Sequence, residues 1–89
     1  MGTKNNPGKF DCYDAAKPDE PMFVLLARDR HAPQLVREWA NLREAELADS
    51  MLSVTAEERA HKVAKIAEAR ACAQAMDEWH EDWIAAAFV

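Results

Sequence analysis

Apolar side chains recur at helical spacing in two long stretches of the chain, residues 32–50 and 56–86. In the first stretch the steps between these positions are one, three, three and five residues, which places them on one helix face. In the second the steps are three or four, and no glycine or proline interrupts them. The sequence therefore predicts two long helices. The positions on their apolar faces are Leu35, Val36, Trp39, Leu42 and Leu47 in the first, and Val63, Ile66, Ala69, Ala73, Met76, His80 and Trp83 in the second.

Both predicted helices have start signals. Asp29 is a candidate cap for the first helix, and Pro33 is tolerated in its first turn because the missing N–H would have no partner there. Thr55 and Glu58 match a capping box ahead of the second helix, in which Thr55 satisfies a free N–H and Glu58 reaches back. We expect a short connection at residues 51–54 between the two helices.

Residues 22–27 form a continuous apolar run that is apolar on both faces if it is extended. Such a run predicts a short strand that is buried on two sides. The sequence contains no second strand-like run, and a lone strand leaves its backbone donors and acceptors unpaired. The run can therefore pair with its copy in another subunit or serve as a buried extended or helical connector. We favour pairing between subunits.

These elements predict a mainly α fold with one short β segment, in the order β-α-α. Residues 1–9 are polar and carry an Asn-Asn-Pro-Gly turn, so we expect a flexible arm there. Residues 10–89 then form a single small helical domain that opens with one helical turn. The second long helix would extend about 45 Å at about 1.5 Å per residue, whereas a compact chain of this length is about 30 Å across. This overhang favours a homo-oligomer.

The charge balance narrows the classes of partner. The chain has 16 acidic and 11 basic residues, for a net charge of −5, and an acidic chain without a basic stripe repels nucleic-acid backbones. We therefore expect no direct nucleic-acid binding. The sequence has no apolar span of about 20 residues and no secretory leader, which predicts a cytoplasmic protein with no membrane contact. Cys12 and Cys72 are far apart in the sequence and are expected to be reduced thiols.

Cationic and protonatable groups cluster between the apolar run and the first long helix. A helix amino terminus offers free N–H groups and a partial positive charge, and guanidinium groups add paired donors for phosphate. The sequence thus offers an anion or nucleotide site at this junction. The alternative is that Asp29 only caps the helix, while the two arginines are solvated or pair with the acids at residues 19 and 20. The candidate ligand-binding residues are Arg28, Asp29, Arg30, His31 and Ala32, with Arg37 about one turn inside the helix.

The second long helix ends in a segment rich in acidic residues and tryptophan. Trp79 and Trp83 are four residues apart and share one helix face. Packing in the core or in an oligomer is the favoured role for this pair, and base stacking and docking of a protein partner are the alternatives. The acidic residues form either a solvated face or a docking surface for a basic protein. The candidate partner-binding residues are Asp77, Glu78, Trp79, Glu81, Asp82 and Trp83.

The sequence does not favour catalysis. It shows no Ser-His-Asp or Cys-His grouping and no glycine-rich phosphate loop, and its histidines are scattered at positions 31, 61 and 80. Neither cysteine has the spacing of a zinc ligand, and the His80-Glu81 pair lacks the second histidine of an HExxH motif. We therefore expect a non-enzymatic protein with no cofactor and no metal.

The region before and into the first long helix carries a specific pattern. Its residues are Asp19, Glu20, Pro21, Met22, Phe23, Val24 and Leu25, then Ala27, Asp29, Ala32, Pro33, Val36, Trp39 and Ala40. This pattern resembles the D-E-P-x-F-V-L-x-A-x-D-x-x-A-P-x-x-V-x-x-W-A signature of small proteins encoded in bacteriophages and prophages. An alanine-rich block at residues 65–79 is similar but less specific, and the tail at residues 83–89 departs from the pattern. The likeness covers roughly residues 12–49 and 62–79; it implies a phage or prophage setting and no particular reaction.

Two functions from different classes follow from these features. The first is a small intracellular binding protein that sequesters a nucleotide-like anion at the junction, in a phage setting to counter host defence. The second is an acidic interaction protein that inhibits a host defence protein through its carboxy-terminal helix. A structural phage component is also compatible with the sequence. We favour the first, because the specific part of the resemblance centres on the junction and not on the acidic tail.

Overall fold

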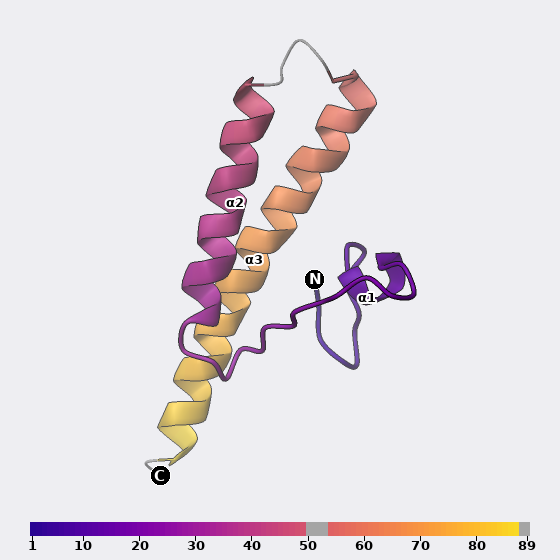
Figure 1. Ribbon diagram of the computed structural model, residues 1–89. Coiled ribbons are helices and arrows are strands. Elements are labelled where there is room, and N and C mark those ends of the chain that lie inside the picture. Colours follow the sequence, from indigo (N-terminus) through magenta and orange to yellow (C-terminus); the bar gives the residue numbers. More distant parts are fainter. Residues whose placement is uncertain (50–53, 88–89) are drawn as a thin grey trace.

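The chain folds into an antiparallel pair of long helices with an extended amino-terminal region beside it (Figure 1). The computed structural model describes residues 1–49 and 54–87, with side chains described as far as residue 83. After the short helix α1 (Cys12–Ala15), the long helices are α2 (Ala32–Asp49) and α3 (Ala56–Ala87). The prediction of a mainly helical fold with two long helices is confirmed. The predicted end of the first helix at Ser50 and most of the connection at residues 51–54 lie outside the described residues.

Local hydrogen bonds at the two helix starts confirm the predicted Thr55 cap in part, and they place Asp29 in a turn before α2 instead of at its cap position. At α3 the Glu58 N–H donates to the Thr55 hydroxyl at 3.1 Å, which is the Thr55 half of the capping box. Before α2 the His31 N–H donates to the Asp29 carboxylate at 2.9 Å, and the Ala32 N–H donates to the Asp29 carbonyl at 3.0 Å. Asp29 therefore fixes the turn from which α2 starts.

The seam between α2 and α3 is narrow and built largely of alanine. Its buried cluster consists of Ala40, Leu47, Ile66 and Ala69. Alanine on both helices allows a close approach, whereas larger side chains hold the axes further apart. Figure 1 shows this plainly, since the helices lie close along their middle and diverge toward residues 49 and 56. The divergence opens space beside Leu47 and Ile66.

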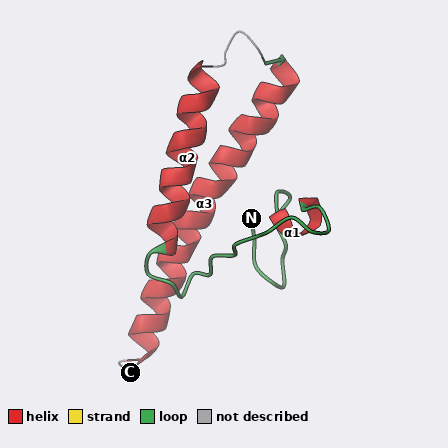
Figure 2. Cartoon of the chain, in the orientation of Figure 1, coloured by secondary structure: helices red, strands yellow, loops and turns green. Residues whose placement is uncertain are grey.

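Within the described residues of the single chain the predicted strand does not form, and its pairing with a second subunit stays a prediction. Residues 21–26 belong to no helix or strand, and Figure 2 shows no strand among the described residues. The alternative of a buried connector is wrong, because Phe23 is 83% exposed and Met22, Val24 and Leu26 are exposed as well. The physical reason is the one that makes a lone strand unfavourable: no second extended segment within the described residues offers it a hydrogen-bonding edge.

The amino-terminal region is anchored on α3 at two points. The Met1 amino group pairs with Glu68 of α3 and, at 2.7 Å, with Asp11. Further along, the Phe10 ring meets the His61 ring edge-on with 5.0 Å between centroids. The molecule as a whole is elongated, with principal extents of 54 × 29 × 20 Å. One side of the α2–α3 pair is therefore covered by this region, and the opposite side is not.

Candidate functional site

The predicted junction site is only partly assembled. Arg28, Arg30 and His31 are exposed, and the structure gives none of their side chains an ion pair within residues 1–49 and 54–83. Asp29 is engaged in the turn, and Ala32 is buried with its N–H donated to the Asp29 carbonyl at 3.0 Å. The structure thus brings three cationic or protonatable groups together at an amino terminus whose nearest amides already have acceptors.

Arg37 does not join that cluster. Its guanidinium Nη2 lies 2.6 Å from the Asp77 carboxylate on α3. The partnership also removes Asp77 from the predicted acidic docking surface. Both of these candidate residues therefore serve, first of all, to tie α2 to α3.

A second cation ties the helices on the same side. Arg70 of α3 reaches Glu44 at 2.5 Å and the Asn41 side-chain oxygen at 3.0 Å, both on α2. We call this side the polar flank and define it by Arg37, Asp77, Arg70, Glu44 and Asn41. Each of its two cations is neutralised by a carboxylate of the other helix, so the flank offers no spare charge to a ligand.

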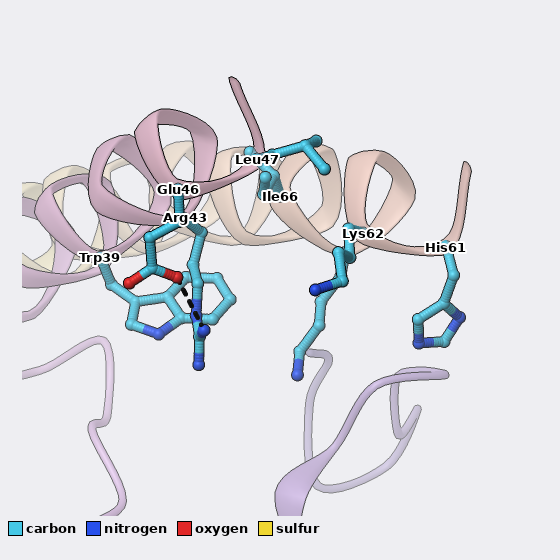
Figure 3. A pocket seen from close by; sticks show the side chains of 8 residues that line it. Trp39, Arg43, Glu46, Leu47, His61, Lys62 and Ile66 are labelled. Atoms are coloured by element: carbon cyan, nitrogen blue, oxygen red, sulfur yellow. Dashed lines mark hydrogen bonds and ion pairs between the residues drawn. The ribbon is translucent and has the colours of Figure 1, made fainter. Parts of the chain in front are cut away.

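The opposite side of the seam holds a groove where the helices diverge (Figure 3). Its volume is about 220 Å³. We call this side the aromatic flank and define it by Trp39 and Arg43 of α2 with His61, Lys62 and Lys65 of α3. Glu46, Leu47 and Ile66 complete the lining.

Trp39 organises the charges of the aromatic flank. The Arg43 guanidinium carbon lies 5.5 Å from the centroid of its ring, and the Lys65 Nζ lies 5.7 Å from it. Both distances fall in the range of attraction between a cation and an aromatic face. One indole therefore lies within range of a cation from each of the two long helices.

The aromatic flank carries unbalanced positive charge. Arg43 has one ion pair, 3.0 Å to Glu46 within its own helix. Lys62 and Lys65 have no ion pair within the described parts of the chain. The flank thus concentrates cations in a chain whose net charge is −5.

Some of the candidate partner-binding residues near the end of α3 have contacts within the chain, and others are only exposed to solvent. Trp79 and Trp83 stack with 6.3 Å between centroids and 6° between ring planes, and they are 46% and 56% exposed. Glu78 accepts a hydrogen bond from Gln74 at 3.2 Å, and Glu81 and Asp82 are exposed. The two tryptophans are therefore not core residues of the single chain.

The pKa shifts of the Cys72 thiol and of the Asp11 carboxylate, which lies in the amino-terminal region, indicate structural roles for both groups. Burial raises the pKa of the Cys72 thiol, so little of it is thiolate near neutral pH. The hydrogen bond from the Met1 amino group, aided by the Gly8 N–H at 2.8 Å, lowers the pKa of Asp11. Within the described residues no group of three or more potential metal ligands comes together. Neither group forms a nucleophile-and-base pair.

Sequence reasoning missed the groove. Its local signals were present, because Trp39 and Arg43 are four residues apart and Lys62 and Lys65 are three apart, spacings that place each pair on one helix face. What the sequence did not reveal is that the two pairs face each other. Whether the two pairs face each other depends on the axial register of α2 against α3, and packing along the alanine seam sets this register.

No family model, curated protein or solved structure matches the chain. Within the described ranges, neither long helix has an apolar stretch that could traverse a lipid bilayer. Function is therefore inferred from the geometry of the two flanks and of the exposed side chains.

Proposed function

We propose that this protein binds a small multivalent anion of the nucleotide class in the groove of the aromatic flank, without converting it chemically. One observation carries the proposal: Trp39 holds Arg43 and Lys65 together in a groove that also presents Lys62 and His61. Only Glu46 opposes them in the lining. A positive groove on an acidic protein concentrates anions at that one place.

Preorganisation is the physical advantage of this arrangement. A free lysine or arginine side chain loses about 0.5–1.5 kcal/mol of conformational freedom when it is immobilised on a ligand. Here the indole of Trp39 already restrains Arg43 and Lys65, through contacts worth about 0.5–1 kcal/mol each at exposed sites. The guanidinium then offers paired donors to phosphate oxygens, and the ammonium adds a point charge.

The size of the groove limits what enters it. Its volume of about 220 Å³ is below the range of about 300–1,000 Å³ that is usual for pockets enclosing a whole small molecule. The phosphate groups of the ligand would therefore lie among Arg43, Lys62 and Lys65, while the remainder stays at the surface. Phosphate binding would also displace Glu46 from Arg43, so affinity depends on the ligand carrying more than one negative charge.

The setting is proposed from the resemblance alone. The likeness of residues 19–40 to phage and prophage proteins favours a role in the host cytoplasm, in which a nucleotide-like defence signal is sequestered. Sequestration requires no catalytic group, only affinity and abundance. A homo-oligomer, proposed from the overhanging helix, would increase the number of sites per particle.

Thermal unfolding with defined anions tests the proposal. Inorganic pyrophosphate, ADP and a cyclic dinucleotide are each added to the unaltered protein, and saturating ligand is expected to raise the midpoint by several degrees. Arg43→Gln with Lys65→Gln should abolish that rise. Each shift is taken relative to the same variant without ligand.

The matched control is Arg28→Gln with Arg30→Gln, which changes the net charge equally but lies at the junction. It should keep the ligand-induced rise. If the control loses the rise and the groove variant keeps it, the predicted junction is the binding site and the groove is not. If none of the anions shifts the unaltered protein, anion binding is wrong altogether.

A second candidate function is docking onto a basic protein surface through the end of α3. The exposed and stacked Trp79 and Trp83 favour it, because tryptophan is enriched at the centres of interfaces. A partner isolated from host lysate should be lost when Glu78, Glu81 and Asp82 are replaced by lysine. Asp77 is left unchanged in this test, since its replacement would break the pair with Arg37.

A further inference from the structure

The tryptophan pair at the end of α3 is flanked by a row of acids. Trp79 and Trp83 form one row along the helix, and Glu78 with Asp82 forms the neighbouring row, each with the spacing of one turn. All four side chains are exposed. Stacking of the two indoles at 6.3 Å makes a flat, rigid apolar surface bordered by negative charge.

The unpaired cations of the junction lie at the same end of the hairpin. The ion pair between Arg37 and Asp77 fixes the register there, with the start of α2 beside the last turns of α3. Arg28 and Arg30 immediately precede that start, and the turn that carries them lies by the lower part of α3 in Figure 1. No ion pair joins them to Glu78 or Asp82 within the described parts of the chain. Opposite charges thus sit at one end without neutralising each other.

The single chain leaves too much surface uncovered. Its accessible area is 7350 Å², whereas a compact monomer of 10.0 kDa exposes about 5,200 Å². The excess of roughly 2,100 Å² is spread over the whole elongated chain, including the exposed side chains of Tyr13 and Phe23. It is more than twice the area of about 800 Å² that each partner contributes to a standard interface. Among the described residues, four of the six buried apolar ones are alanines, so the seam itself buries little.

We infer that the Trp79–Trp83 surface is the interface between two copies of this chain, paired about a two-fold axis. In this arrangement Arg28 and Arg30 of each copy meet Glu78 and Asp82 of the other. A two-fold interface must be self-complementary, because each surface meets its own copy. This end of the hairpin meets that requirement in charge, since it carries two exposed arginines ahead of α2 and two exposed acids beside the tryptophan pair. A basic foreign partner would leave the two arginines facing like charge.

Mass measured in solution tests the inference. Light scattering or sedimentation of the full chain, from low micromolar to near-millimolar concentration, is expected to show a species of twice 10.0 kDa. Trp83→Ala should weaken the dimer about 30-fold, as expected for a central tryptophan. Val63→Ala, an exposed residue nearer the other end of α3, should leave the mass unchanged. Circular dichroism checks that each variant keeps its helices.

Complementary charge-reversal variants provide the decisive experiment. Arg28→Glu with Arg30→Glu should be monomeric, and so should Glu78→Arg with Asp82→Arg. Mixing the two variants should restore a dimer, because each supplies the charge that the other now needs. A single-copy mass at all concentrations overturns the inference. So does a dimer whose dissociation constant is unchanged by Trp83→Ala, or one that is lost on Phe23→Ser, which would place the interface at the exposed connector.

The two proposals fail separately. The groove lies where α2 and α3 diverge, and the tryptophan pair lies toward the opposite end of α3. A protein that stays monomeric but is stabilised by pyrophosphate contradicts only the dimer. A dimer that ignores every anion contradicts only the binding function.

Discussion

The two flanks of the α2–α3 seam carry similar residues and use them differently. On the polar flank, Arg37 and Arg70 each reach a carboxylate of the opposite helix. On the aromatic flank, Arg43 pairs only within its own helix, and Lys65 approaches an indole instead of an acid. The cations of the first flank are neutralised across the seam, whereas Lys62 and Lys65 of the second have no carboxylate partner within the described residues and stay available.

The difference follows from what stands opposite each cation. A carboxylate neutralises the charge and lowers its attraction for a third group, whereas an aromatic face attracts the cation and leaves its charge in place. Trp39 is therefore the residue that makes the aromatic flank a binding surface, whereas the polar flank only stabilises the helix pair. Exposed ion pairs contribute little to folding, so the seam must supply most of the stability on which both flanks depend.

The largest effect is expected where the seam and the groove share a residue. Ile66 is 5% exposed and belongs to both the seam cluster and the groove lining. Ile66→Ala should lower the free energy of unfolding by about 2–4 kcal/mol, through lost burial and the cavity left behind. Urea unfolding followed by helical circular dichroism measures it. The total free energy of unfolding of a small domain is only about 5–13 kcal/mol. The substitution should therefore measurably weaken the packing of α2 against α3 along both flanks.

Val63→Ala is the matched control for that change. It also removes methyl groups from a β-branched residue of α3, but its side chain is 49% exposed. Its cost should be a small fraction of that of Ile66→Ala. Equal losses in the two variants would mean that the seam is not where the stability resides.

A smaller effect is expected on ligand binding when Trp39 is replaced by leucine. Leucine keeps an apolar side chain against the seam but removes the ring that positions Arg43 and Lys65. Two lost contacts of about 0.5–1 kcal/mol each should weaken pyrophosphate binding about tenfold. Calorimetric titration measures this, with Trp79→Leu as the control that leaves affinity unchanged. An unaltered affinity in Trp39→Leu would show that the cations act without the indole.

The helices and their starts were predictable because they depend on local chemistry. Apolar periodicity placed α2 and α3, and Thr55 makes the hydrogen bond expected of a residue at a helix start, whereas Asp29 bonds His31 in the turn before α2 and does not cap it. Residues 22–27 were not predictable in the same way. Apolar composition indicated burial, but burial of an extended segment requires a partner strand, and no described residue provides one.

The candidate site shows the same difference between features that local sequence predicts and features that depend on distant contacts. The exposed cations of the junction could be located from sequence, because Arg28 and Arg30 border a helix start. The diversion of Arg37 to Asp77, and the meeting of Trp39 with Lys65, depend on contacts between residues far apart in the chain. Side-chain pairs within one helix are visible in a sequence, whereas pairs across a seam appear only once the register is known.

The smallest effect is expected from the polar flank, and it sharpens the contrast most directly. Arg37 and Asp77 are 41% and 40% exposed, so their 2.6 Å ion pair is screened by solvent. Arg37→Gln should lower the free energy of unfolding by less than about 1 kcal/mol, and a double-mutant cycle with Asp77→Asn should give a coupling of about 0.2–1 kcal/mol. That coupling should shrink in high salt, because mobile ions screen exposed charges. Pyrophosphate affinity should be unchanged, since a cation already neutralised by a carboxylate has little attraction left for another anion. A loss of binding in Arg37→Gln would mean that the two flanks are electrostatically one surface, and the distinction between paired and available cations would then fail.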